Sequence, residues 1–336
     1  IKTFSIGFDE KSFDESDYAI KVSKFLGTEH YSKILTEKDS LNLIPHILNM
    51  IDEPLADASI IPAYLLSEFT KERVTVALSG DGGDELFAGY PTFQADILAN
   101  AYQKVPNFIK KNILEKIILN LPVSDKNFSL DFKLKKFIEG ASLPQAHRHQ
   151  VWLGSFNRRA RIQLFKKEIW HELEKKNEFE ETELYYKNIQ DTLYVYLRTY
   201  LMDYILVKAD RASMLNSLEV RSPFLDYNIV DFVNSLPYNF KLRGVTCKYI
   251  LKKLMADKLP KDIVSRPKKG FGIPLSYWLR HDLKDFCSQV LSERNINSAG
   301  LFNFDYIYKL KNEHFSGKRN NRKLLWTLLV FQVWHE

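Results

Sequence analysis

The chain has 336 residues, of which 45% are hydrophobic and 27% are charged, and its formal net charge is +6. This is the composition of a folded globular protein, and the length predicts roughly two domains. Basic and acidic residues are mixed along the chain without a polybasic block or a long apolar run, so neither a nucleic-acid partner nor a membrane span is expected. Cys247 and Cys287 have no CxxC partner, which favours a reducing, cytoplasmic location over a disulfide framework.

The first 95 residues read as strands that alternate with helices. Strands are predicted at 2–8, 30–35 and 73–78, and helices at 14–26, 40–50 and 62–71. Asp14 is the expected N-cap of the first helix, and Gly27 is its expected stop. This alternation predicts an α/β part with a parallel sheet. The apolar run at 74–78 predicts a strand that is covered on both faces.

Helical periodicity dominates after about residue 95. The segments 108–121, 194–215, 247–259 and 322–336 are predicted helical, and strand signals are scarce. We therefore predict a nucleotide-binding α/β part at 1–95 and a mostly helical part at 96–336. In residues 209–226, charged residues such as Arg211, Glu219 and Arg221 alternate with apolar ones, which predicts a partly buried ion-pair network on a helix that ends at the Ser-Pro pair at 222–223.

The stretch SGDGGDE at residues 79–85, which we call the glycine turn, directly follows the third predicted strand. In open α/β sheets, ligands bind beyond the carboxyl ends of the strands, and glycine lets the backbone approach a ligand closely. Asp81, Asp84 and Glu85 would repel a phosphate unless a cation lay between them, so the turn predicts a metal–polyphosphate site. The alternative is a structural turn that places Asp84 or Glu85 at the start of the next helix.

A second stretch, RPKKGFG at residues 266–272, which we call the lysine loop, carries Arg266, Lys268 and Lys269 beside two glycines. Lysines on such a loop suit an anion that arrives and leaves, such as pyrophosphate. The alternative is an ordinary basic surface loop.

These stretches together resemble the synthetase domain of glutamine-dependent asparagine synthetases, a family of ATP pyrophosphatases. The matching segments are FSIGF at 4–8, DEPLADASIIPAYLLS at 52–67, LSGDGGDELFAGY at 78–90, KADRASMLNSLEVRSPFLD at 208–226 and RPKKGFGIP at 266–274. They occur in the family's order over nearly the whole chain. The resemblance implies a twisted parallel sheet of the adenine-nucleotide α-hydrolase type, followed by a large helical part.

The resemblance also implies a reaction, with ATP as substrate and Mg²⁺ as its ion. ATP would adenylate the side chain of aspartate and release pyrophosphate, and ammonia from a glutaminase domain would convert β-aspartyl-AMP to asparagine. The backbone of Ile6 would contact adenine, and Ser79 and Gly80 would bind the nucleotide. Asp81 stands where many relatives have Glu and would help to form the adenylate, and Asp84 would help to hold Mg²⁺.

Three lysines match the part of the family that handles pyrophosphate. Lys268 would stabilise the phosphoryl transition state and the departing pyrophosphate, with Lys269 as the close alternative and Lys248 as a weaker candidate. Offsetting the charge that builds on phosphoryl oxygens is what a lysine and a divalent cation do in such a reaction.

The chain departs from the family pattern because it contains no Ser-Gly-Gly-x-Asp-Ser phosphate loop and no glutaminase domain. We therefore expect a C-terminal portion of a longer enzyme that is inactive alone. The strand that carries the missing loop should be central in the sheet, so an open sheet edge is expected, and such an edge would favour pairing with another chain, as in a homodimer.

Three alternatives stay open at this point. A related amidotransferase would act on a different carboxylate, and competition between aspartate and other acids would separate it from asparagine synthesis. A non-catalytic remnant would keep the fold without the chemistry. A tRNA-modifying relative would need a basic RNA-binding face and would show salt-dependent binding.

Overall fold

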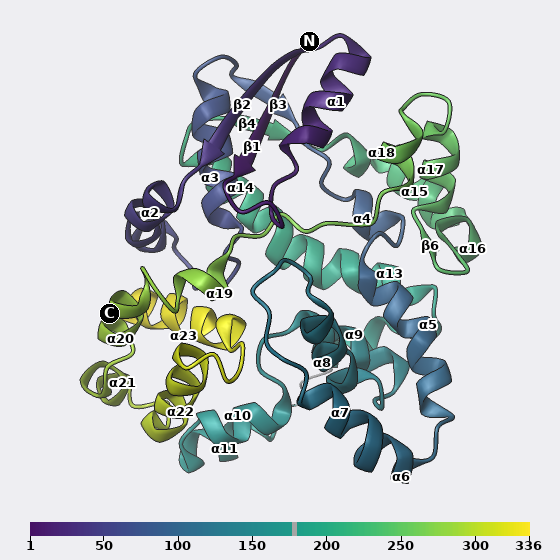
Figure 1. The fold of residues 1–336 in the computed structure, drawn as a ribbon. Coiled ribbons are helices and arrows are strands. Elements are labelled where there is room, and N and C mark those ends of the chain that lie inside the picture. The colour runs from purple at the N-terminus through teal and green to yellow at the C-terminus, as the bar shows by residue number, and fades with distance from the viewer. Residues whose placement is uncertain (177–179) are drawn as a thin grey trace. The chain divides into compact units, whose positions relative to one another are not determined.

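The computed structural model describes residues 1–176 and 180–336 of the protein (Figure 1). The chain forms two compact units. Unit 1 comprises residues 1–40, 59–98 and 181–273, and unit 2 comprises residues 41–58, 99–180 and 274–336. The boundary predicted at residue 95 lies beside the passage from unit 1 to unit 2 at residue 98, and the chain returns to unit 1 at residue 181.

Unit 1 combines short strands with helices. Its elements are β1 (Lys2–Phe8), α1 (Ser16–Leu26), β2 (Glu29–Leu35), α3 (Ile60–Lys71), β3 (Val76–Leu78), α4 (Gly83–Leu86), α13 (Asp191–Val195), the π-helix η2 (Tyr196–Ile205), α14 (Leu206–Met214), β4 (Glu219–Arg221), the 3-10 helix η3 (Pro223–Leu225), α15 (Tyr227–Ser235), α16 (Tyr238–Lys241), β5 (Leu242–Arg243), β6 (Thr246–Cys247), α17 (Tyr249–Met255) and α18 (Lys261–Ser265). Helices α2 (Glu37–Met50), α5 (Pro91–Gln103) and α12 (Glu180–Tyr185) run across a boundary between the units.

The β1–α1–β2 segment forms as predicted. β1 and β2 pair in parallel from Lys2 opposite Glu29 to Phe8 opposite Leu35, and α1 ends at Gly27, which has a φ of 65°. The N-cap of α1 is Glu15, one residue after the predicted Asp14, although the Asp14 carboxylate accepts the Ser16 N–H at 3.1 Å. α3 is buried along most of its length and packs against β1, β2 and α14.

A second parallel pair, β3 with β4, corrects two predictions. The helix expected to continue to the Ser-Pro pair ends at Met214, and residues Glu219–Arg221 form β4 beside β3. Val76 and Leu78 of β3 are 40% and 73% exposed, so the prediction that both faces of this strand are covered is wrong. Glu219 and Arg221 do pair, at 2.7 Å, but on the surface and not in a partly buried network.

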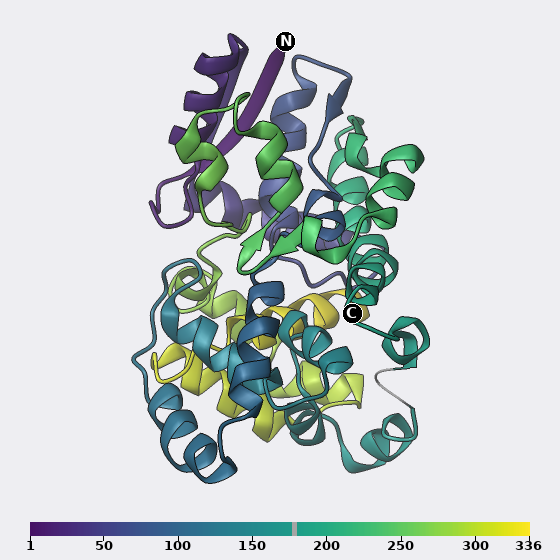
Figure 2. The same ribbon diagram turned by 90° about the vertical axis from the view of Figure 1, so that its right-hand side faces the viewer.

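The sheets of the described residues are small. β1–β2, β3–β4 and the antiparallel β5–β6 hairpin, seen as green arrows in Figure 2, are separate two-stranded sheets. The fold is thus a mixed α/β arrangement with small parallel sheets, and the single twisted sheet implied by the family resemblance is not among them. Residues 191–214 form the continuous helical segment α13–η2–α14, in agreement with the helix predicted at 194–215.

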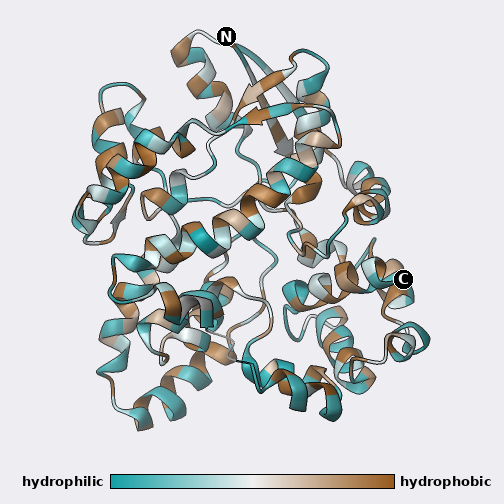
Figure 3. Ribbon diagram, turned by 180° about the vertical axis from the view of Figure 1, so that it is seen from behind, coloured by the Kyte–Doolittle hydropathy of each residue, from teal (hydrophilic) through white to brown (hydrophobic). Residues whose placement is uncertain are grey.

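Unit 2 is built from helices. Besides most of α2 it contains α6 (Asn107–Ile109), the π-helix η1 (Lys110–Leu114), α7 (Glu115–Leu119), α8 (Leu130–Gly140), α9 (Gln145–Leu153), α10 (Arg158–Leu164), α11 (Lys167–Leu173), α19 (Leu275–Trp278), α20 (Lys284–Val290), α21 (Glu293–Ala299), α22 (Phe304–Phe315) and α23 (Arg322–His335). Hydrophobic and hydrophilic residues alternate along the helices in Figure 3, which is the pattern of helices that bury one face. None of the helices in the described ranges combines the length and apolarity that crossing a bilayer requires.

The core of unit 2 contains a fully buried histidine, His314, which has an exposed fraction of 0%. Its Nδ1 accepts the N–H of Asn321 at 3.2 Å, so protonation there would set two donors against each other. Burial, together with the nearby Arg280, lowers the pKa of His314 to about 4.

The burial of His314 predicts how the free energy of unfolding depends on pH in acid. The unfolded imidazole takes up a proton near pH 6.5 and the folded one only near 4, so the folded state loses stability as the pH falls through this window. We expect the loss to approach about 3 kcal/mol at the acid end. Urea unfolding at pH 7 and pH 4.5 checks this against His314→Asn, which keeps an acceptor for Asn321 and should show a flatter pH dependence. An equal pH dependence in both proteins would contradict the assignment.

Candidate functional site

The glycine turn begins where β3 and β4 end side by side. The Ser79 N–H donates to the Arg221 carbonyl at 2.8 Å, which extends the pairing of the strands by one residue. The Ser79 hydroxyl donates to Asp81 Oδ2 at 2.8 Å and lies 2.9 Å from the Ser222 hydroxyl. The carboxyl ends of two parallel strands therefore present hydroxyl groups and a carboxylate together, which is where ligands bind in α/β folds.

Two glycines of this turn have different surroundings. Gly82 has a φ of 87°, and a Cβ at this position would overlap the Leu225 side chain, so only glycine fits. A Cβ at Gly80 would meet no heavy atom within 4 Å. The backbone at Gly80 is therefore open to a ligand, whereas the one at Gly82 is closed against the protein.

The three carboxylates of the glycine turn point to three different partners. Asp81 accepts from Ser79, and Glu85 is 2% exposed and accepts a hydrogen bond from the Tyr90 hydroxyl. Burial raises the pKa of Glu85. The described part of the chain contains no group of three or more metal-capable side chains, so the interpretation of all three carboxylates as one metal site is wrong for Glu85. Asp84 and Glu85 lie in the first turn of α4, as the structural alternative predicted.

Asp84 is the centre of a charge cluster. Its Oδ2 lies 2.6 Å from Nζ of Lys268, and its Oδ1 lies 2.9 Å from Nζ of Lys248. The side chains of Asp84, Lys268 and Lys248 are 16%, 34% and 28% exposed. Burial by itself raises the pKa of the Asp84 carboxyl, but the two ammonium groups outweigh it, and the pKa lies below its usual value.

The backbone holds Lys248 in place for this contact. Lys248 precedes α17 with a φ of 54°, a left-handed conformation that is uncommon outside glycine, and its N–H donates to the Phe87 carbonyl at 3.0 Å. A Cβ at Gly89 would overlap both Asp84 Oδ1 and Lys248 Cε. Gly89 thus leaves the room in which the lysine reaches the carboxylate.

The lysine loop ties two parts of unit 1 together. Lys268 reaches the glycine turn after β3, and its Nζ also lies 5.8 Å from the centre of the Tyr90 ring. Lys269 donates to the Asp14 carbonyl at 2.7 Å, and Arg266 pairs with Glu15 at 2.8 Å, both in the segment between β1 and α1. Neighbouring cations of one loop therefore bind the segments that follow two different parallel strands.

The predicted site residues thus fall into two groups. The structure brings Lys248 and Lys268 to Asp84, and Ser79 to Asp81. Lys269 lies at the segment after β1, the strand in which Ile6 is buried opposite Lys33. Sequence reasoning did not single out Tyr90 or Ser222. Tyr90 closes the segment LSGDGGDELFAGY, but Ser222 could be found only by recognising β4 as a strand.

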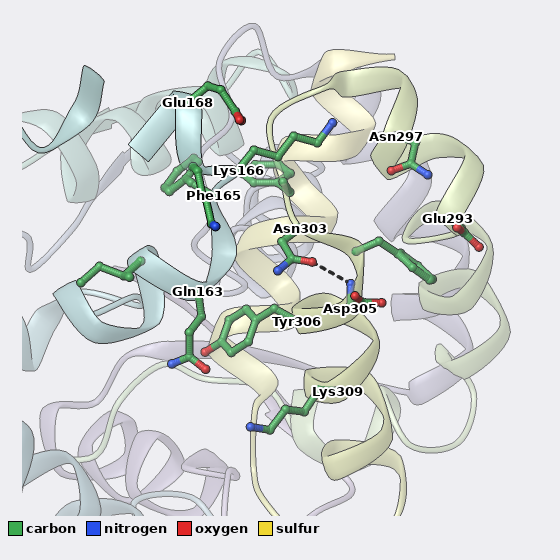
Figure 4. A pocket seen from close by; sticks show the side chains of 14 residues that line it. Gln163, Phe165, Lys166, Glu168, Glu293, Asn297, Asn303, Asp305, Tyr306 and Lys309 are labelled. Atoms are coloured by element: carbon green, nitrogen blue, oxygen red, sulfur yellow. Dashed lines mark hydrogen bonds between the residues drawn. The ribbon is translucent and has the colours of Figure 1, made fainter. Parts of the chain in front are cut away.

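A surface pocket of about 720 Å³ lies elsewhere, within unit 2 between α10–α11 and α21–α22 (Figure 4). None of the predicted site residues lines it. Its charged side chains are Lys166, Lys167, Lys309, Glu168, Glu293 and Asp305. Because lysines and carboxylates balance there, this pocket has no net charge that would attract a polyphosphate.

Comparison with known proteins gives a consistent result. A family model described as asparagine synthase matches residues 1–336. The chain is 32% identical over 338 positions to asparagine synthetase (glutamine-hydrolyzing) 1 of Bacillus subtilis strain 168, and the match covers 100% of this chain and 52% of that protein. It is 26% identical over 283 positions to asparagine synthetase (glutamine-hydrolyzing) 3 of the same strain, and the match covers 81% of this chain and 40% of that protein. It is 24% identical over 362 positions to amidase chyE of Penicillium rubens, covering 99% and 52%. The chain spans about half the length of these relatives.

Proposed function

Because the chain belongs to the asparagine synthase family, we propose that it performs the ATP-dependent amidation of aspartate to asparagine through β-aspartyl-AMP. The observation that carries this proposal is the convergence of Lys248 and Lys268 on the glycine turn, beside the open backbone of Gly80. A nucleotide at the ends of β3 and β4 would find backbone room and two ammonium groups within reach of its phosphates.

Each residue of the cluster has a proposed role. The Ser79 and Gly80 backbone would contact the nucleotide, and the backbone of Ile6 would contact adenine. Asp81, oriented by the Ser79 hydroxyl, would act in adenylate formation. Lys268 would offset the charge that develops on the phosphoryl oxygens when the aspartate carboxylate attacks the α-phosphate.

The remaining lysines would bind the departing pyrophosphate. Lys248 already lies in the cluster, whereas Lys269 would first have to leave its hydrogen bond to the Asp14 carbonyl.

Magnesium enters the proposal only as the ion that accompanies ATP. Both carboxylate oxygens of Asp84 face ammonium groups, so the residues as arranged do not fit a resident metal ion. Mg²⁺ in such sites is commonly held by one or two carboxylates together with substrate phosphates, and Asp84 would serve as that carboxylate only after the phosphates had taken over its lysines.

The acceptor acid separates this proposal from its main alternative, a related amidotransferase. The test is pyrophosphate release from ATP by the complete gene product, with ammonia present and with aspartate, glutamate or another carboxylic acid in turn. We expect release and AMP formation that depend on aspartate. Equal or higher rates with a different acid would assign the chain to that alternative, which the likeness to an amidase also supports.

The nitrogen donor and the location are proposals of the same kind. The relatives of twice the length are named as glutamine-hydrolyzing, which supports ammonia supplied by a glutaminase domain outside these 336 residues. Among the described strands β3 pairs with β4 only, and the other edge of β3 supports a further parallel strand that pairs with it from outside these residues, or a homodimer through that edge. A cytoplasmic enzyme is consistent with two cysteines that are both free.

A direct prediction concerns the 336 residues by themselves. They contain the two lysines and the glycine turn but no Ser-Gly-Gly-x-Asp-Ser sequence, so we expect no pyrophosphate release from ATP and aspartate. A coupled phosphate assay with pyrophosphatase measures this. A control with added pyrophosphate verifies the coupling. Release by this chain alone that Lys268→Ala abolishes would contradict the prediction.

A further inference from the structure

The two lysines of the site already share one carboxylate of the protein itself. In the described structure, Lys248 and Lys268 each take one oxygen of the same Asp84 carboxylate, at 2.9 and 2.6 Å. A multiply charged anion cannot use these ammonium groups fully while the carboxylate holds them. A polyphosphate would therefore compete with the Asp84 carboxylate for the two lysines.

We propose that Asp84 is an internal counter-ion, and that a polyphosphate must displace it to bind Lys248 and Lys268. This inference rests on the proposed function, because it takes the two lysines as phosphate-binding groups. Because Asp84 must be displaced, the site binds a free polyphosphate more weakly than the two lysines would bind it without this carboxylate. The carboxylate keeps two like charges together that would otherwise repel each other.

Burial makes the competition strong. Asp84 is 16% exposed and lies between Gly89 and the two lysines, so water screens these ion pairs less than it screens pairs at the surface. The two lysines are held differently. Lys248 is fixed by the helix start and by its hydrogen bond to Phe87, whereas Lys268 lies in residues 266–274, which form neither helix nor strand.

The lysine loop offers a matched control. Arg266 and Glu15 form an ion pair of similar length, 2.8 Å, with side chains that are 31% and 28% exposed. Glu15→Gln removes the same negative charge from the same region as Asp84→Asn does. A general electrostatic effect would change the pyrophosphate affinity of both variants alike. Displacement of an internal counter-ion would change the affinity of Asp84→Asn alone.

The experiment is a calorimetric titration of the complete gene product with inorganic pyrophosphate, in EDTA and at fixed ionic strength. We expect Asp84→Asn to bind pyrophosphate at least about tenfold more tightly than the wild type does, because two ammonium groups lose their internal partner. We expect Glu15→Gln to change the dissociation constant by less than about threefold. Equal tightening in both variants, or none in Asp84→Asn, would overturn the proposal.

A second set of variants keeps the test decisive if Asp84→Asn does not fold. Lys248→Met should weaken pyrophosphate binding, because Asp84 then pairs with Lys268 alone. The double variant Asp84→Asn/Lys248→Met has the net charge of the wild type, and it should bind more tightly than Lys248→Met does. A double variant that binds no better than Lys248→Met would refute the competition.

The same measurements separate this inference from the proposed function. If Lys248→Met and Lys268→Met both bind pyrophosphate as the wild type does, the lysines are not phosphate-binding groups and both proposals fail. If the lysine variants weaken binding but Asp84→Asn does not strengthen it, only the counter-ion role is lost.

Discussion

Replacing Lys268 by Ala should lower the rate of pyrophosphate release from ATP and aspartate by a factor on the order of 10² to 10³ in the complete gene product. The Lys268 ammonium group lies 2.6 Å from Asp84 in the glycine turn, where the phosphates of a bound nucleotide are proposed to lie. Its charge is most useful when negative charge builds on the phosphoryl oxygens. We therefore expect kcat and kcat/KM to fall together, with a smaller change in KM for ATP.

The adjacent lysine is the control for this prediction. Lys269→Ala removes the same charge one residue further along, but Lys269 Nζ is bonded to the Asp14 carbonyl in the segment after β1. We expect its rate to fall less than about tenfold, because Lys269 anchors the lysine loop and would reach the pyrophosphate only after leaving the Asp14 carbonyl. Initial-rate measurements on both variants decide between them. A larger loss in Lys269→Ala than in Lys268→Ala would exchange the proposed roles of the two lysines.

Replacing Gly82 by Ala should destabilise the chain by about 2–4 kcal/mol. The backbone at Gly82 has a φ of 87°, which costs a residue with a Cβ conformational energy, and the added methyl group would overlap the Leu225 side chain. Leu225 is partly buried against the apolar cluster of Leu86, Phe87 and Val233, so moving it aside would disturb that packing. Urea unfolding should show a lower midpoint with an unchanged m-value.

Gly80→Ala is the matched substitution in the same turn. A methyl group there meets no atom within 4 Å, so the unfolding midpoint should stay close to that of the wild type. The variant should instead weaken nucleotide binding, because the added group occupies the space proposed for the ligand. If Gly82→Ala and Gly80→Ala unfold at the same urea concentration, the structural distinction between the two glycines is wrong.

Some of the structure follows directly from local sequence patterns. The helix that stops at Gly27 and the helical segment over residues 191–214 depend on contacts between residues that are near in sequence. Periodicity and capping residues report such contacts, because they reflect the geometry of single helices and strands. The strands β1 and β2 are recognisable one by one, and their parallel pairing follows from the helix that joins them.

β4 was not predictable in this way. The Glu219–Arg221 segment alternates polar and apolar residues over too few positions to separate a strand from the end of a helix, and it becomes a strand only by pairing with β3. The exposure of Leu78 is also a tertiary property, because it depends on which neighbours cover β3 and not on the apolar character of the strand itself.

Local sequence shows which residue types belong to the site, namely glycines and carboxylates in one turn and lysines in one loop, and their order shows the family. The pairing of these charges, in contrast, depends on the folded chain. Asp84 and Glu85 are neighbours in the chain, but successive residues of a helical turn point about 100° apart. One carboxylate is therefore buried against Tyr90 and the other faces the two lysines, because long-range folding brings Lys248 and Lys268 to one side of the turn only.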